Sequence, residues 1–118
     1  MKSAALATVA ILLAVPAIAQ DIPQLVGTWK SDTGVTYVIA EQDGGQFKGE
    51  VTYPLRDGGG TSTDPVVGSV APDGETVVMA AEEGHHVGTL QSATVLDLCY
   101  VEAGESPIVA CAQYTKQP

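Results

Sequence analysis

Short runs of β-branched and aromatic residues, separated by glycine-rich breaks, make up the chain from residue 25 onward. None of these runs keeps the period of about 3.6 residues that an amphipathic helix needs. In QFKGEVTY at 46–53, Phe47, Val51 and Tyr53 share one face, and the residues between them are mostly polar. Such alternation is typical of a strand with one buried and one solvated face. The pattern therefore predicts an all-β protein.

The same pattern predicts about eight strands joined by short turns. We expect them at residues 25–30, 34–41, 46–53, 66–71, 75–81, 85–92, 94–103 and 108–116. Short turns make successive strands antiparallel, and a meander of about eight strands can close into a barrel without free edges. The expected fold is a small antiparallel up-and-down barrel. A two-sheet sandwich shares the same strand pattern and is the alternative.

Two further features bear on this fold. The longest break, PLRDGGGTSTDP at 54–65, is predicted to be a mobile loop. Four glycines, Gly27, Gly49, Gly68 and Gly88, recur at spacings of 22, 19 and 20 residues. We interpret that spacing as one hairpin period, which would place the glycines on alternate strands. Glycine inside a strand often marks a bend or a close backbone approach, and a small barrel needs such bends.

Two cysteines, Cys99 and Cys111, are the only ones in the chain. Their midpoint is residue 105, inside the break GESP, so a hairpin centred there places Ala103 opposite Pro107 and the cysteines opposite each other. Directly opposed antiparallel residues are close enough for a disulfide. The spacing is not the C-x-x-C of a redox pair. We therefore predict one structural hairpin disulfide.

The first residues have the three-part pattern of a secretory signal peptide: Lys2, an apolar run at 4–15, and a small-residue box at 17–19. We predict a signal peptide at 1–19 and a single β-barrel domain at 20–118. The predicted location is the periplasm or the outside of the cell. No other segment has the length and apolarity of a membrane span, so we expect none in the mature chain.

The net charge of the chain restricts the classes of partner that it can bind. Five basic residues stand against fourteen acidic ones, which gives a net charge of −9. Nucleic acid and anionic lipid repel such a protein, so we expect no nucleic-acid partner. The charge suits solubility or a cationic partner, and solubility is the simpler interpretation. The oligomeric state is left open.

Catalytic and metal-binding patterns are weak. His85 and His86 are adjacent, so a regular strand points them to opposite faces and they cannot chelate one metal together. A pH-sensitive patch is another role for them. RDGGGTSTD at 56–64 lacks the lysine of a phosphate loop, and G-x-S-x-G and H-E-x-x-H are absent. We expect no catalytic residues, metal or cofactor. An enzyme with its active site inside the barrel is an alternative hypothesis.

Trp29 carries the one resemblance to a known superfamily. A Gly-x-Trp on the first strand of a small secreted barrel, Gly27 to Trp29 here, resembles the calycins, which include lipocalins and avidins. In those folds the tryptophan closes one end of the barrel, and a basic residue from the last strand packs across it. The resemblance implies that Trp29 and Lys116 form such a plug.

The likeness is closest to an avidin opening and covers roughly residues 25–53. It fails where avidins bind biotin: Ser31, Thr33 and Val35 replace the Asn, Leu and Ser of such openings, and the chain has no asparagine. A biotin pocket needs those groups, so we reject biotin binding. The second half of the chain is similar to small exported bacterial proteins without an assigned activity, which implies no chemistry.

We expect a non-catalytic binding protein for a small apolar molecule or a protein surface. The ligand would enter the open end, away from Trp29 and near the 54–65 loop, with Tyr53 and Arg56 as contacts. The alternative is a secreted protease inhibitor. Small bacterial metalloprotease inhibitors are barrels with one disulfide that insert an N-terminal segment, here QDIPQL at 20–25. The late position of the cysteines departs from their pattern.

Overall fold

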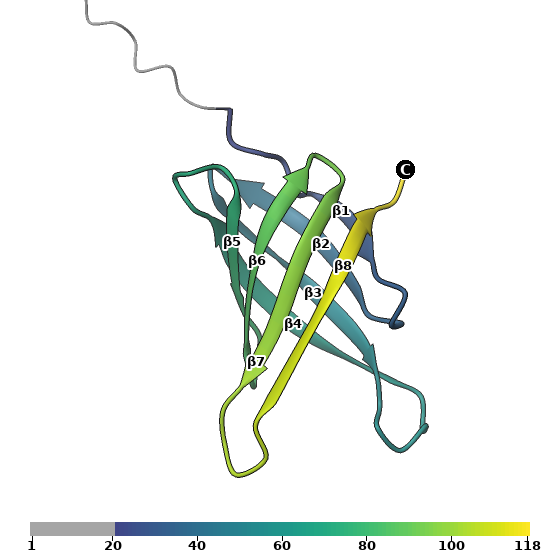
Figure 1. Cartoon of the computed structure of the whole chain (residues 1–118). Coiled ribbons are helices and arrows are strands. Elements are labelled where there is room, and N and C mark those ends of the chain that lie inside the picture. The colour runs from purple at the N-terminus through teal and green to yellow at the C-terminus, as the bar shows by residue number, and fades with distance from the viewer. Residues whose placement is uncertain (1–20) are drawn as a thin grey trace, which may run out of the picture.

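Eight antiparallel strands form a closed barrel in a computed structural model that describes residues 21–118 (Figure 1). The signal peptide predicted at 1–19 lies outside the described residues. Each strand pairs with the next along the chain, and the last pairs with the first. The strands are β1 (Gly27–Lys30), β2 (Thr36–Asp43), β3 (Gln46–Pro54), β4 (Thr61–Val70), β5 (Thr76–Ala80), β6 (His85–Ser92), β7 (Val95–Glu102) and β8 (Ile108–Lys116).

The predicted all-β up-and-down barrel is confirmed, and the sandwich alternative is wrong. A closed antiparallel barrel of eight strands is consistent with a calycin-like fold. Within residues 21–118, no helix is long and apolar enough to cross a membrane.

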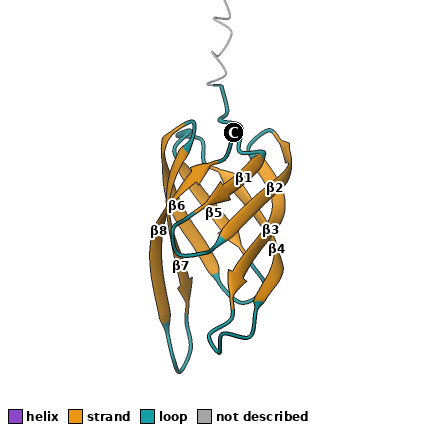
Figure 2. Cartoon of the chain, turned by 90° about the vertical axis from the view of Figure 1, so that its right-hand side faces the viewer, coloured by secondary structure: helices purple, strands orange, loops and turns teal. Residues whose placement is uncertain are grey.

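The two ends of the barrel differ. The turns β2–β3, β4–β5 and β6–β7 lie at one end, together with residues 21–26 and the C-terminus; we call this the closed end (Figure 1). The other four connections lie at the opposite end, which we call the mouth. The hairpins β3–β4 and β7–β8 extend furthest at the mouth (Figure 2).

The loop predicted at 54–65 is shorter than expected. β3 continues to residue 54 and β4 begins at Thr61, so only residues 55–60 form the loop. β-branched residues favour a strand here: Thr63 pairs with Thr52, and their hydroxyl oxygens are 2.8 Å apart. The sequence pattern predicts a loop here because the stretch is polar and contains proline, which is typical of loops.

Pro65 explains how a strand can contain a proline at this point. Proline has no N–H for the ladder and is tolerated where a strand lacks a neighbour on one side. Pro65 pairs with Glu50 of β3, whereas β5 pairs with β4 only from Val67 onward. The mouth-side half of β4 is therefore an open edge beyond the end of β5.

Other element boundaries also differ from the predicted ones. β1 begins at Gly27, and Leu25 precedes it as a buried loop residue. β2 continues to Asp43, which leaves a two-residue turn before β3. The last pair of the β7–β8 hairpin is Glu102 with Ile108, so its loop has five residues and Ala103 does not pair with Pro107.

The core follows the alternation along each strand and fills the barrel from its middle to its closed end. Phe47 and Val51 of β3 are buried, as the pattern at 46–53 predicts. The buried apolar side chains are Leu25, Trp29, Tyr37, Ile39, Phe47, Val51, Val66, Val70, Val77, Met79, Leu96, Leu98 and Tyr114. Apolar burial of this kind is the main stabilising contribution to a small barrel.

Three of the four recurring glycines mark close approaches inside the barrel. A Cβ on Gly49 would collide with the carbonyl oxygen of Val38, and one on Gly88 with the carbonyl oxygen of Asp97. Gly49 lies beside the register shift in β2, so the bend and the glycine coincide. Gly68 makes room for the Phe47 ring. The predicted alternate-strand placement is wrong, because β3 and β4, which carry Gly49 and Gly68, are neighbours.

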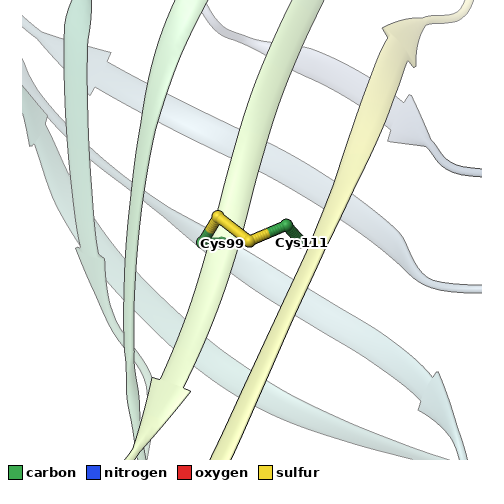
Figure 3. The surroundings of a disulfide bond; sticks show 2 residues. All are labelled: Cys99 and Cys111. Carbon is green, nitrogen blue, oxygen red and sulfur yellow. A yellow bond between two sulfur atoms is a disulfide. The ribbon is translucent and has the colours of Figure 1, made fainter.

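The predicted disulfide is confirmed. Cys99 of β7 and Cys111 of β8 are directly paired, and their sulfur atoms are 2.01 Å apart (Figure 3). Cys99 alternates with Leu98 and Tyr100, which line the interior, so the bond lies on the outer side of the wall. Disulfides persist in oxidising compartments, which is the environment that this bond indicates.

Candidate functional site

Trp29 is buried at the closed end, with 1% of its surface exposed. Its Nε1–H donates to the carbonyl oxygen of Leu25 at 2.9 Å. Lys116, at the end of β8, pairs with Trp29 across the β1–β8 seam, and its Nζ lies 5.7 Å from the ring centroid. The structure therefore brings together the two residues of the predicted plug.

Residues 23–25 cover this end of the barrel. The N–H of Leu25 donates to Oε1 of Gln42 at 2.7 Å, and Nε2 of Gln42 donates to the carbonyl oxygen of Pro23 at 2.8 Å. Nζ of Lys116 donates to the carbonyl oxygen of Gln24 at 3.2 Å. The Leu25 side chain is 2% exposed. This part of the segment predicted to enter a protease cleft is thus held against its own barrel.

The mouth contains a cavity of about 580 Å³. Its walls combine small apolar side chains from several strands with four tyrosines and His86. Both predicted ligand contacts lie here: Tyr53 near the end of β3, and Arg56 in the exposed loop that follows. β8 contributes two small residues, Ala110 and Ala112, to the lining, together with the larger Ile108 and Tyr114.

His86 lies at the inner end of this cavity, between two aromatic rings. The centroid of its ring is 5.4 Å from that of Tyr37, edge to face, and 4.9 Å from that of Tyr100. The side chain is 3% exposed, and its Nδ1 has no hydrogen-bond partner. Burial, and then the charge of His85, lower the pKa of His86 to about 4. The imidazole is therefore neutral at pH 7.

The neighbouring phenols are also neutral. The Tyr37 and Tyr114 rings meet edge to face, with centroids 5.0 Å apart. Burial raises the pKa of both hydroxyls, so neither ionises at physiological pH. Tyr37, His86 and Tyr114 thus form a cluster of uncharged aromatic rings that lines the cavity.

Tyr100 connects this aromatic surface to the rim. Its hydroxyl donates to Oε2 of Glu102 at 2.6 Å, and burial together with this hydrogen bond raises its pKa to about 12. The ring packs against Gly84, where a Cβ would collide with it. A glycine at that point of the β5–β6 turn therefore leaves room for the Tyr100 ring.

A second tyrosine–carboxylate pair lies across the mouth. The Tyr53 hydroxyl donates to Oδ2 of Asp64 at 2.8 Å. Asp64 lies on the extended part of β4, and alternation with Val66 points it inward. The two residues are close because β3 and β4 continue as a paired ribbon beyond the rest of the barrel.

The charged groups at the cavity are mainly acidic. Asp64, Glu83 and Glu102 line it, together with the single basic residue Arg56. Within residues 21–118 the only salt bridge joins Lys48 and Glu41, which lie outside this cavity. The three carboxylates at the mouth therefore have no cationic partner in the described part of the chain.

Sequence reasoning missed several residues of this cavity. The sequence pattern does not predict His86, Tyr100 or Glu102 as ligand contacts, and it predicts a loop at Asp64. A usable signal was present, because Tyr100 and Glu102 continue the inward phase of Leu98 along β7. Extending the alternation to the strand ends would have placed them at the mouth.

A metal has no evident site in the described residues. No group of three or more histidine, cysteine, aspartate or glutamate side chains among residues 21–118 is arranged to hold an ion. His85 is exposed and His86 is buried, as expected for adjacent residues on opposite faces of a strand.

Comparison of the chain with protein-family models, with curated proteins and with solved structures found no match. The geometry of the cavity is therefore the basis on which a function can be proposed.

Proposed function

We propose that this protein is an exported, non-catalytic binding protein that takes up a small molecule with a substantial apolar part at the mouth of its barrel. The observation that carries the proposal is the cavity of about 580 Å³ at one end of a barrel whose other end is filled by Trp29 and Leu25. Pockets for small molecules are typically about 300 to 1,000 Å³, mainly apolar, with a few convergent polar groups.

The composition of the cavity supports this reading. Apolar contact area comes from side chains such as Val35, Val51 and Ile108, and polar groups converge from Tyr53, Tyr100 and His86. A calycin-type ancestry, which the Gly-x-Trp opening suggests, agrees with a ligand in the open end of a barrel. The signal-like N-terminus and the disulfide support action in the periplasm or outside the cell.

The alternatives have less support. A protease inhibitor that acts through residues 20–25 would have to free Leu25, whose side chain is buried and whose N–H is hydrogen-bonded to Gln42. A protein partner would have to insert a side chain into the mouth to use the same cavity. A small molecule needs neither rearrangement.

The first experiment is native mass spectrometry of the protein purified, without reduction, from the periplasm or medium of a cell that makes it. We expect a reproducible additional mass of a few hundred daltons. The matched variants are Ala112→Trp, which fills the cavity, and Val87→Thr, at an exposed position on the outer wall. Only the first should abolish the additional mass.

Two results would overturn this function. The first is a bare protein in every preparation. The second is a bound polypeptide in place of a small molecule, which would favour a protein-binding or inhibitory role.

A further inference from the structure

Two half-buried carboxylates at the mouth each use one oxygen within the protein. Asp64 accepts the Tyr53 hydroxyl through Oδ2, and Glu102 accepts the Tyr100 hydroxyl through Oε2. Among the described residues, neither carboxylate accepts another side-chain hydrogen bond, and neither is in a salt bridge. Each therefore retains acceptor capacity and a negative charge beside the cavity.

The aromatic surface next to these carboxylates is of the kind that attracts cations. The faces of tyrosine rings carry negative electrostatic potential, and a cation within about 6 Å of a ring centroid is stabilised by it. Tyr37, Tyr100 and Tyr114 all line the cavity. Their hydroxyls have raised pKa values and stay neutral, so the attraction comes from ring faces combined with the two carboxylates.

His86 gives an independent indication of a ligand. His86 lines the cavity, its Nδ1 is buried without a hydrogen-bond partner, and leaving a buried polar atom unpaired costs free energy. A neutral imidazole has one donor and one acceptor nitrogen, so it can bond to a polar ligand without repelling a positive charge.

The same groups disfavour the other ligand charges. A ligand carboxylate or phosphate would lie against Asp64, Glu83 and Glu102, with only the exposed Arg56 to offset them. A bare metal ion lacks a coordinating cluster among residues 21–118. A purely apolar ligand would leave the His86 nitrogen unpaired and both carboxylates without a counter-charge.

We infer that the cavity selects organic cations, namely a protonated amine or a quaternary ammonium group attached to an apolar or aromatic body. The inference rests on the proposed small-molecule function and names the chemical class of its ligand. The cationic group lies between Asp64 and Glu102 and against the tyrosine faces, and the apolar body contacts the inner wall. The acidic composition of the chain fits such a partner.

Three probes of matched shape test the charge preference: tryptamine as the cation, tryptophol as its neutral analogue, and indole-3-propionate as the anion. Calorimetric titration at pH 7 and low salt should give the tightest binding for tryptamine. We expect about a tenfold or larger preference over tryptophol, because hydrogen bonds to charged groups are the stronger kind. Added salt should weaken the binding of tryptamine more than that of tryptophol.

Variants that remove one negative charge test whether Asp64 and Glu102 cause the preference for the cation. Glu102→Gln and Asp64→Asn keep an oxygen to accept the tyrosine hydroxyl and remove the negative charge. Each should weaken tryptamine binding by about tenfold and leave tryptophol binding nearly unchanged. Glu50→Gln is the matched control, since it removes the same charge from an exposed position on the outer face of β3, and it should change tryptamine binding by less than about twofold.

Failure of this inference can be told apart from failure of the proposed function. If tryptophol or indole-3-propionate binds as tightly as tryptamine and Ala112→Trp abolishes that binding, the cavity is a ligand site and the cation preference is wrong. If none of the probes binds at millimolar concentration, the cation inference is wrong, and the native mass measurement decides the proposed function by itself.

Discussion

His86 illustrates how the environment of one residue changes the pH response of the molecule. Its imidazole contacts Tyr37 from β2 and Tyr100 from β7, follows His85 along β6, and has no carboxylate hydrogen-bonded to it. Burial lowers its pKa from 6.5 to about 4. Between these values the unfolded chain binds a proton that the folded chain excludes, so the free energy of unfolding falls as the pH falls.

This shift predicts that the free energy of unfolding falls by up to about 3 kcal/mol between pH 6.5 and pH 4. Above pH 6.5 His86 should cause no pH dependence of stability, because its imidazole is neutral in both the folded and the unfolded chain. Urea unfolding at pH 7 and pH 4.5 measures it. His86→Phe keeps an aromatic ring and should lose less stability on acidification than the wild type. His85→Gln, at an exposed position, removes only the smaller cause of the shift, so its loss should be slightly smaller than that of the wild type and larger than that of His86→Phe. Equal losses in the wild type and His86→Phe would contradict the prediction.

Substitution of Trp29 should lower the stability of the barrel and leave ligand binding at the mouth unchanged. Trp29→Phe leaves a smaller ring and removes the donor to the Leu25 carbonyl oxygen, so we expect a loss of about 2 kcal/mol. Lys116→Met keeps the apolar stem across the ring and should cost less than about 1 kcal/mol. Chemical unfolding measures both. A change in binding at the mouth in the Trp29 variant would show that the two ends are coupled.

At the scale of elements, the β7–β8 hairpin combines the disulfide with one wall of the cavity. Cys99 and Cys111 are 12 residues apart in sequence, and a cross-link over a loop of this size stabilises by about 3 kcal/mol in the chain-entropy description. The double substitution Cys99→Ala with Cys111→Ala should therefore lower the free energy of unfolding by about 2 to 3 kcal/mol and keep the barrel, since backbone pairing continues on both sides of the bond.

Circular dichroism and urea unfolding of the double variant test this expectation, with reduced wild-type protein as the matched sample. Loss of the folded barrel in the double variant, or a cost below about 0.5 kcal/mol, would contradict it.

Elements also show where sequence reasoning succeeds. Alternation identified the strands because buried and more exposed residues alternate in β2, β5 and β7, and the pairing of Cys99 with Cys111 followed from counting outward from one turn. The early start of β4 was missed because its residues include Pro65 and short polar side chains. Their strand conformation comes from pairing with β3, which local propensity does not encode.

The candidate site was predictable only in part, because some of its contacts join strands that are far apart in the sequence. The longest predicted loop led to the prediction of Tyr53, at its edge, and Arg56, within it, and both line the cavity. The contact between Tyr37 and His86 joins β2 to β6 across the barrel, so it depends on closure and not on any single hairpin. Long-range contacts of this kind cannot be obtained from the pattern within one strand.

At the scale of the whole molecule, the seam that closes the barrel is its shortest interface. β1 and β8 are joined by two residue pairs, whereas β3 and β4 are joined by nine. Local opening requires less free energy where fewer backbone hydrogen bonds and contacts must be broken. Hydrogen exchange should therefore be faster for the amides of β1 and the last residues of β8 than for those of β3.

Exchange followed by nuclear magnetic resonance would test the seam residue by residue. Equal protection of β1 and β3 would show that the barrel opens only by global unfolding, contrary to the expectation from strand pairing.

Both termini of the described chain lie at the closed end. Gln117 donates its N–H to the carbonyl oxygen of Thr28 at 2.8 Å, so the last residues run beside the first strand (Figure 1). A tether attached to either terminus leads away from the cavity. Coupled to a sensor chip, a bead or a fusion partner through either end, the barrel would present its mouth to the solution, and immobilisation would leave ligand access intact.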